Sequence, residues 1–502
     1  MKEKLYKFIT KTRQKKQFIL QVLKIIRYGL LVLGILGFSI CILRKNLNNA
    51  VFFILVILLS NVLYGFMNIS KRAAYLLFLA SFFCFLLGRM TVDFLNNGYV
   101  RFYFSEAISI HMLISIGLSL VFMQVGYEVF ERFIRKKKIS CDENSNRDDS
   151  IYILRLRNYS AVLFFVSAIM AIAMNIEQII YIKTNSYVDL YTNFSSHIPR
   201  VFQIVGNMHI AAFLVHLATR PEKRKCILPI VIFGIIAVSV MVAGDRGTFI
   251  IDVSIIIVYI FWRQYRDKEV WISRKMIIIG LICIPFVAAF LSYSVYLREG
   301  VDVGDKTISN QFARFFKSTG NSVDILGYGK QYEDKFPQSF YSFGELVDYV
   351  KHNPISEKIL GESKPVQHTA EYAMTMHSYA HTISYFINPE LYLSGHGKGS
   401  SYIAEAYNDF GYIGIIICNL VYGILLAVIN ILPKKRPILI AIIFIALRIL
   451  FYTPRGPMIV PISYVLNITT VFVLLFLWLM SKYADDIGSR IMSKFQKLKG
   501  KE

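Results

Sequence analysis

The sequence has few cysteines for its 502 residues, and they are not arranged as metal ligands. Its six cysteines form no CxxC pair, and no Cys/His spacing typical of a zinc site occurs. The long polar segment 298–409 has no cysteine at all. We therefore expect this segment to hold its shape without disulfides, and we expect no metal or other cofactor.

Three further patterns are missing. No fixed-period internal repeat occurs, so a transporter built from two repeated halves gains no support. The glycine-rich run 395–399 lacks a following Lys-Ser/Thr pair and a preceding strand, so it is not a nucleotide-binding loop. No small-residue cleavage site follows the first apolar run, which we therefore interpret as an uncleaved first span.

Apolar runs dominate the rest of the chain, of which 55% is hydrophobic. Runs near twenty residues are long enough to cross a membrane as helices. The sequence thus predicts an all-α polytopic integral membrane protein with about 12 transmembrane helices and one large outer loop that contains helices. The predicted spans are 26–43, 50–67, 73–95, 106–130, 158–182, 201–219, 227–243, 247–262, 276–297, 411–432, 438–453 and 459–480.

Charge is distributed unevenly along the chain. The whole sequence has a net charge of +23, but residues 298–409 hold 10 Lys+Arg against 14 Asp+Glu. The basic excess therefore marks cytoplasmic loops and tails rather than a nucleic-acid partner. Predicted inner segments are 71–72, 132–138, 220–225, 263–275, 434–436 and the tail from 482; predicted outer segments are 184–196 and 298–409, and the pair 44–45 is an exception.

This orientation divides the chain into five parts. They are a basic cytoplasmic amino terminus (1–25), nine transmembrane helices (26–297), a large extracytoplasmic loop (298–410), three transmembrane helices (411–480) and a basic cytoplasmic tail (481–502). The large loop is too long to be without structure. Helical spacing of aromatic residues predicts an amphipathic helix near 308–316, and further helices are expected at 342–351 and within 372–387.

Two arginines in predicted outer turns are candidate phosphate ligands. Arg246 lies in the turn 244–247 and Arg455 in the turn 453–457. A guanidinium forks onto phosphate oxygens and stays charged at any relevant pH. For Arg246, an Asp–Arg pair that completes a hairpin is an equal alternative.

Three more arginines are weaker candidates. Arg448 lies inside a predicted span, where a charge usually faces a polar cavity or a partner, although it could also reach the outer surface. Arg298 and Arg314 lie at the entry of the outer segment and could join the other arginines around one pyrophosphate. For Arg314, lipid headgroups are the alternative partner.

Four residues are candidate general bases. Glu405 precedes the tenth span by about two turns, where partial burial would raise the pKa of a carboxyl; a first-turn glutamate that stabilises the helix dipole is the alternative. His377, His381 and His396 lie within twenty residues of one another, and a helix would put the first two on one face. No third ligand and no HExxH pattern supports zinc.

Residues 397–411, GKGSSYIAEAYNDFG, resemble the Gly-Ser-Ser…Ala-Glu…Phe-Gly signature of the bacterial O-antigen (Wzy-type) polysaccharide polymerases. The Gly-x-Arg turn at Arg246 and the large outer loop late in the chain are also similar to that family. The layout resembles the family over the whole chain, and the motifs cover about thirty residues.

The resemblance implies a glycosyltransferase that joins oligosaccharide repeat units carried on undecaprenyl pyrophosphate, by inverting block transfer at the outer face of the inner membrane. Arg246 and Arg455 would then hold the pyrophosphate, helped by Arg298 or Arg314. Glu405 would accept the proton of the acceptor sugar, with the histidines as rivals. Ser401 and Asp409, in the same motif, complete the candidate substrate-binding residues.

Other activities remain open at this point. An O-antigen ligase or another outer-face transferase would use similar substrates, whereas a lipid-linked oligosaccharide flippase would more often show short outer loops and internal repeats. The implied partners are the lipid-linked oligosaccharide, the growing glycan and membrane lipids. A chain-length regulator and a flippase are further candidate partners, and no nucleic acid is expected.

Overall fold

The computed structural model describes residues 2–136, 147–185, 189–299, 307–338, 340–352, 354–361 and 363–499. These residues form helices joined by turns and loops, and no strand occurs in the ranges just given. The predicted all-α class is confirmed.

The helices that precede the long polar segment are α1 (Lys2–Leu43), α2 (Leu47–Phe66), α3 (Ile69–Phe82), α4 (Gly88–Asn97), α5 (Glu106–Lys136), α6 (Arg147–Thr184), α7 (Asp189–Thr192), α8 (Arg200–Asn207), α9 (His209–Ala218), α10 (Lys223–Val242), α11 (Arg246–Arg266) and α12 (Arg274–Glu299). Within the segment lie α13 (Ile308–Thr319), α14 (Asp324–Gln331), α15 (Gly344–Lys351), α16 (Pro354–Leu360), α17 (Ala370–Thr375), α18 (Tyr379–Ile387) and α19 (Pro389–Leu393). The chain ends with α20 (Tyr402–Val428), α21 (Pro437–Leu450), α22 (Val460–Leu466) and α23 (Ile468–Lys499).

All twelve predicted spans are helical, but they do not all form single long helices. Among the described residues, 9 helices are long and apolar enough to cross a membrane. A tenth candidate is the pair α22 and α23, which is bent by 53° at its break. The remaining two runs form shorter apolar helices at Ile278–Leu291 and Pro437–Leu450, so the predicted count of twelve is not confirmed.

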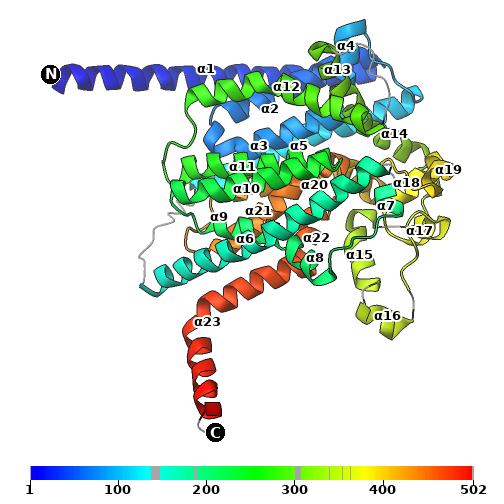
Figure 1. Ribbon diagram of the computed structural model, residues 1–502. Helices are drawn as coiled ribbons and strands as arrows, with labels where there is room; N and C mark the ends of the chain where they lie inside the picture. Colours follow the sequence, from blue (N-terminus) through cyan, green and yellow to red (C-terminus); the bar gives the residue numbers. More distant parts are fainter. Residues whose placement is uncertain are drawn as a thin grey trace.

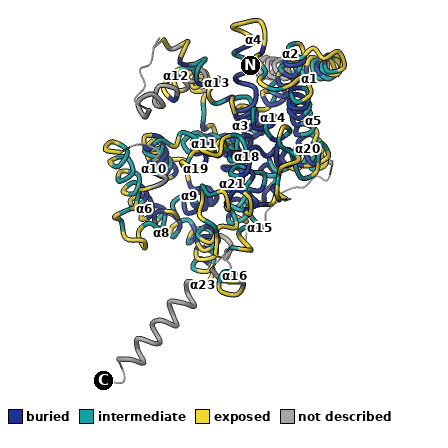
Figure 2. The backbone as a smooth tube through the Cα atoms, turned by 90° about the vertical axis from the view of Figure 1, so that its right-hand side faces the viewer, coloured by how far each residue is buried: buried dark blue, intermediate teal, exposed yellow. Residues whose placement is uncertain are grey.

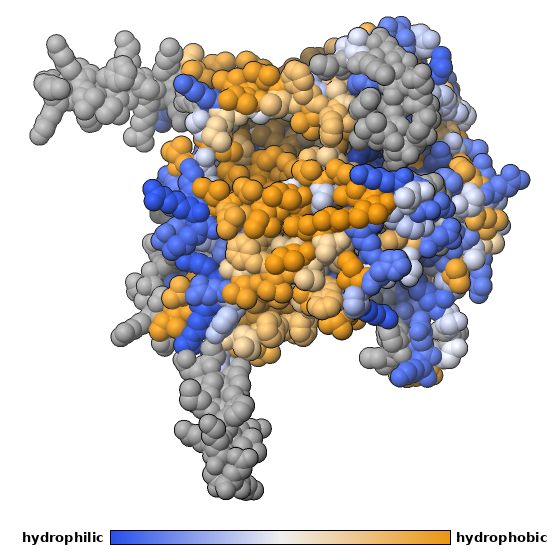
Figure 3. Space-filling view, in the orientation of Figure 1, coloured by the Kyte–Doolittle hydropathy of each residue, from blue (hydrophilic) through white to orange (hydrophobic). Residues whose placement is uncertain are grey.

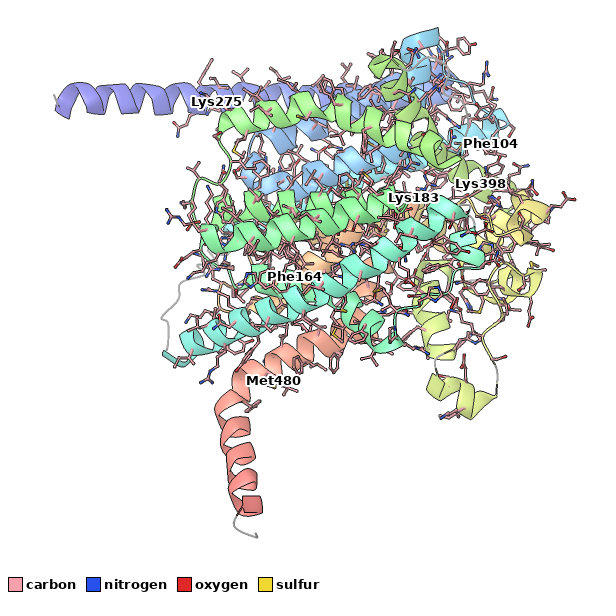
Figure 4. The ribbon with its side chains drawn as sticks, in the orientation of Figure 1. Phe104, Phe164, Lys183, Lys275, Lys398 and Met480 are labelled. Carbon is pink, nitrogen blue, oxygen red and sulfur yellow. The ribbon has the colours of Figure 1, made fainter. Side chains whose placement is uncertain are left out.

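The long helices lie side by side and form one bundle (Figure 1). A broad apolar belt crosses the middle of this bundle and is flanked on both sides by polar surface (Figure 3). Helices α13–α19 gather at one end, which we call the loop end. Lys183 and Lys398 lie at this loop end, whereas Lys275 lies at the opposite end (Figure 4). The chain is therefore a multi-pass membrane protein.

The core of the bundle is built on close contact between α5 and α20. Gly126 and Gly423 leave room for the backbone of the facing helix, because a Cβ atom on either would lie within 2.3 Å of a carbonyl oxygen of Leu420 or Met123. Small residues allow helices to approach closely in a membrane. Burial is greatest around such inner helices, including α3 and α21, while α6 and α10 are exposed on their outer faces (Figure 2).

The expected helices of the long segment are present. The predicted amphipathic helix is α13, which packs its aromatic face on the bundle: the rings of Phe316 and Phe83 lie 5.5 Å apart. The helix expected near 342–351 is α15, and the region 372–387 contains α17 and α18. Much of the surface at this loop end is polar (Figure 3).

Candidate active site

A cavity of about 890 Å³ lies at the loop end, between the bundle and the helices of the long segment. Its volume is within the range of small-molecule sites. We call it the polar cavity. It is lined by Phe85, Gly244, Asp245, Arg246, Gly247, Ile250, Phe315, Thr319, Gln367, His368, Ala380, His381, Ser384, Tyr392, Gly395, His396, Gly397, Gly399, Tyr452 and Arg455. Four predicted site residues therefore line the same cavity, namely Arg246, Arg455, His381 and His396.

Arg246 is the first residue of α11, so the amino-terminal end of that helix lies at the polar cavity. Asp245 caps the helix by accepting hydrogen bonds from the Thr248 backbone N–H (3.0 Å) and hydroxyl (2.6 Å). The Arg246 guanidinium donates to the backbone oxygen of Leu291 at 2.8 Å, which fixes its direction. A helix amino terminus and an arginine both favour an anion, so this wall of the cavity is suited to phosphate.

Arg455 reaches the same cavity from the turn between α21 and α22. It closes a short 3-10 helix, Thr453–Arg455, and its stem packs beside Gly399 of the glycine-rich run. Gly399 has φ +85°, a conformation that other residues rarely adopt. Glycine is therefore favoured at position 399 by the backbone conformation, since an added Cβ atom would make only ordinary contacts with Arg455.

His381 and His396 line the polar cavity from the long segment. His381, on α18, places Nδ1 3.0 Å from the Tyr392 hydroxyl. Burial, together with the charges of His368 and Lys364, lowers the pKa of His381 to about 4, so its imidazole is neutral at physiological pH. His396 is exposed, and its Nδ1 lies 3.1 Å from the Ser394 hydroxyl.

Glu405 lies in the first turn of α20 and is only 1% exposed. One carboxylate oxygen accepts a hydrogen bond from the Ser400 hydroxyl at 2.5 Å, and the other accepts from the Met458 backbone N–H at 2.7 Å. It does not line the polar cavity. Its carboxylate instead joins the glycine-rich run, through Ser400, to the chain just after Arg455.

Of the other two motif residues, Asp409 holds the long segment in place and Ser401 does not. Asp409 accepts hydrogen bonds from the backbone N–H groups of Tyr341 (3.2 Å) and Ser342 (2.6 Å), at the start of a short 3-10 helix before α15. Ser401 precedes α20, and its buried hydroxyl has no hydrogen-bond partner among the described residues. Neither of them lines the polar cavity.

His377 lies apart from the other two histidines. The prediction that one helix would put His377 and His381 on the same face is wrong, because α18 begins only at Tyr379. His377 is buried, and its Nδ1 lies 2.9 Å from Asp348 of α15. We therefore assign it to the docking of α15.

Arg448 and Arg314 are not among the described residues that line the polar cavity. Arg448 is buried and forms an ion pair with Asp252 of α11, so its charge is compensated inside the bundle. Arg314 lies on α13, whose Phe315 and Thr319 do line the cavity. The side chain of Arg298 lies outside the described residues.

Sequence spacing missed several residues of the cavity wall. His368 donates its Nδ1–H to the Tyr392 backbone oxygen at 3.0 Å, and its ring lies 5.3 Å from that of His381. Tyr392 and Tyr452 contribute aromatic rings to the cavity wall. Nothing in the sequence marked them as wall residues except that their segments are rich in aromatic residues. Within the described part of the chain, no group of three or more His, Cys, Asp or Glu residues is placed to hold a metal ion.

Comparison with known proteins gives one match. The sequence model of the family described as O-antigen polysaccharide polymerase Wzy matches residues 26–485, which is nearly the whole chain. The chain belongs to this family. No curated protein and no solved structure matches it.

Proposed function

We propose that this member of the O-antigen polysaccharide polymerase family moves a growing glycan from undecaprenyl pyrophosphate onto the terminal sugar of a lipid-linked repeat unit. The transfer would take place in the polar cavity, at the outer face of the bacterial inner membrane, with both chain termini in the cytoplasm. The observation that carries the proposal is that Arg246, Arg455, His381 and His396 line one cavity at the loop end.

Arg246 and Arg455 would bind the pyrophosphate of the donor lipid. Both reach the cavity from turns at the loop end of the bundle, where a lipid headgroup would lie. As the bond between the anomeric carbon and the pyrophosphate oxygen breaks, negative charge develops on the leaving group. Fixed cations and the amino terminus of α11 stabilise that charge without a divalent metal.

A histidine of the cavity would act as the general base. It would take the proton of the acceptor hydroxyl as that oxygen attacks the anomeric carbon from the face opposite to the leaving pyrophosphate, which inverts the configuration. His381 is neutral at physiological pH and so is able to accept a proton, although its lowered pKa makes it a weak base. His396 is exposed in the cavity. Glu405, which was the preferred base from the sequence, would position Arg455 through its bonds to Ser400 and Met458.

Replacement of the two arginines tests the proposal. Lysine keeps the charge but cannot make the bidentate contact of a guanidinium with phosphate. Cells with Arg246→Lys or Arg455→Lys should therefore make little polymer, while the protein still reaches the membrane. Arg101→Lys, at an exposed arginine of the loop 98–105, is the matched control and should polymerise normally. The readout is polymer length together with the oligosaccharide held on the lipid carrier.

The accumulated product separates this activity from its rivals. Loss of a polymerase leaves single repeat units on the carrier, whereas loss of a ligase leaves finished polymer on it. Loss of a flippase would leave single repeat units on the cytoplasmic side. Near-normal polymer in either lysine variant would reduce that arginine to a structural role.

A further inference from the structure

A second large groove lies at the end of the bundle opposite to the polar cavity. Its volume is about 980 Å³, and we call it the α21–α23 groove because these two helices form its sides, with the start of α6 beside them. Most of its lining is apolar and comes from α21, α22 and α23, for example Leu439, Leu466, Val471 and Leu475. Met480, beside its mouth, lies on the same side of the molecule as Lys275 and opposite to Lys398 (Figure 4).

The groove is polar at one end and apolar along the rest of its length. Arg155, Lys435, Arg436 and Lys482 come from the starts of α6 and α21 and from the part of α23 before its kink at Tyr483, so they gather at the mouth. No acidic side chain is among the described residues that line the groove. The lining therefore matches a ligand with an anionic head and an apolar tail.

The length of the apolar part fits one leaflet of a membrane. Val471 and Lys482 both line the groove on α23, and the helical rise between them is roughly 16 Å. Half of the hydrocarbon thickness of a bilayer is about 15 Å. The chain bends by 53° between α22 and α23. Val465 and Leu466, at the end of α22, form the end of the groove that lies farthest from Lys482.

Trp478 marks the boundary between the two parts. Its ring lies 5.1 Å from the Lys482 ammonium, and it lines the groove beside Leu475. Tryptophan is typical of the level of lipid headgroups, where one side of the ring is apolar and the other is hydrated. A headgroup phosphate at Arg436 and Lys482 would leave an acyl chain beside Leu475 and Val471.

We propose that the α21–α23 groove binds an anionic glycerophospholipid, with its phosphate at Arg436 and Lys482 and an acyl chain along α21 and α23. The basic residues at the mouth complement a negatively charged headgroup. The apolar wall, which is as long as one leaflet, fits an acyl chain. The site is separate from the polar cavity and does not depend on the glycosyl transfer proposed there. It would seat the carboxyl-terminal helix pair in the membrane.

Quenching of Trp478 fluorescence tests the proposal directly. Full-length protein is reconstituted in phosphatidylcholine nanodiscs that contain either phosphatidylglycerol or phosphatidylcholine with brominated acyl chains, at equal mole fraction. The difference between the native protein and Trp478→Phe isolates the quenching of Trp478 from that of the other two tryptophans. Phosphatidylglycerol should quench Trp478 at several-fold lower mole fraction than phosphatidylcholine does.

The charge requirement is tested with a double variant and a matched control. Arg436→Gln with Lys482→Gln should reduce the preference for phosphatidylglycerol by about fivefold for each charge removed. Arg224→Gln with Lys225→Gln removes two exposed charges outside the groove and should leave the preference unchanged. Equal quenching by both lipids in the native protein, or an undiminished preference in the groove variant, would overturn the proposal. Displacement of phosphatidylglycerol by a small amount of polyprenyl phosphate would also overturn it, because the occupant would then be the carrier lipid.

Discussion

The Glu405 carboxylate joins two turns that are far apart in the sequence, since Ser400 and Met458 donate to its two oxygens. Glutamine can accept from only one of these donors. If the residue positions Arg455, Glu405→Gln should lower the rate by less than about 30-fold, in line with a loss of roughly 1–2 kcal/mol, and keep the shape of the pH profile. The measurement is in vitro polymerisation of lipid-linked repeat units as a function of pH.

A general base would behave differently at this position. Its removal costs about 10²–10⁴ in rate and abolishes the acidic limb of the pH profile. Ser400→Ala, which removes one donor without touching the carboxylate, is the companion variant and should resemble Glu405→Gln in both respects. A loss of the acidic limb in Glu405→Gln would restore the carboxylate as the base.

The pKa of His381 gives a second prediction at the residue scale. Because burial holds the pKa near 4, the imidazole stays neutral and able to accept a proton down to that pH. If His381 is the base, kcat/KM should stay level as pH falls from 7 through 6.5, the ordinary pKa of histidine, and decline only as pH approaches about 4. A decline centred near 6.5 that disappears in His396→Ala would instead assign the base to the exposed His396.

The sequence predicted individual candidate residues more accurately than it predicted their burial and contacts. The turns with Arg246 and Arg455 were visible because each interrupts an apolar run. The sequence predicted partial burial of Glu405 but not its nearly complete burial, which depends on a contact with Met458, 53 residues later. The predicted span begins at 411, whereas α20 begins at Tyr402, so Glu405 lies in its first turn, as the alternative interpretation from the sequence has it.

At the scale of elements, the contact between α5 and α20 should be sensitive to one methyl group. A Cβ atom at Gly423 would lie 2.2 Å from the Met123 backbone oxygen, and a backbone atom cannot move aside as a side chain can. Gly423→Ala should therefore destabilise the protein by about 1–3 kcal/mol. The measurement is thermal unfolding of the purified protein in detergent.

A glycine on an open helix face provides the matched control. Gly234 lies in α10, and no atom would lie within 4 Å of a Cβ atom there. Gly234→Ala should stabilise the helix by up to about 1 kcal/mol, since alanine is the better helix former. Two changes of the same kind should thus move the melting temperature in opposite directions, and equal shifts would contradict the close approach of α5 and α20.

Periodicity located the helices but not the way in which they are broken or paired. Apolar composition is the same in a straight span and in the bent pair α22 and α23, so the break at 467 carried no clear signal. The short helix α21 was predicted as a full span for the same reason. Contacts such as the ion pair between Arg448 and Asp252 depend on which faces of two helices meet, and hydropathy does not contain that information.

The orientation of the whole molecule is open to a direct test. Residues 298–409 differ in charge from the basic loops, and Lys398 and Lys275 lie at opposite ends of the bundle. If the loop end faces outward, as the positive-inside rule predicts, single cysteines at Lys335 and Lys364 in a cysteine-free background should react with an impermeant thiol reagent in intact cells. Both positions are exposed, as is the control position Lys225 at the start of α10. A cysteine at Lys225 should react only after the membrane is opened. Labelling at position 225 but not at position 335 in intact cells would show the opposite orientation and would exclude transfer at the outer face.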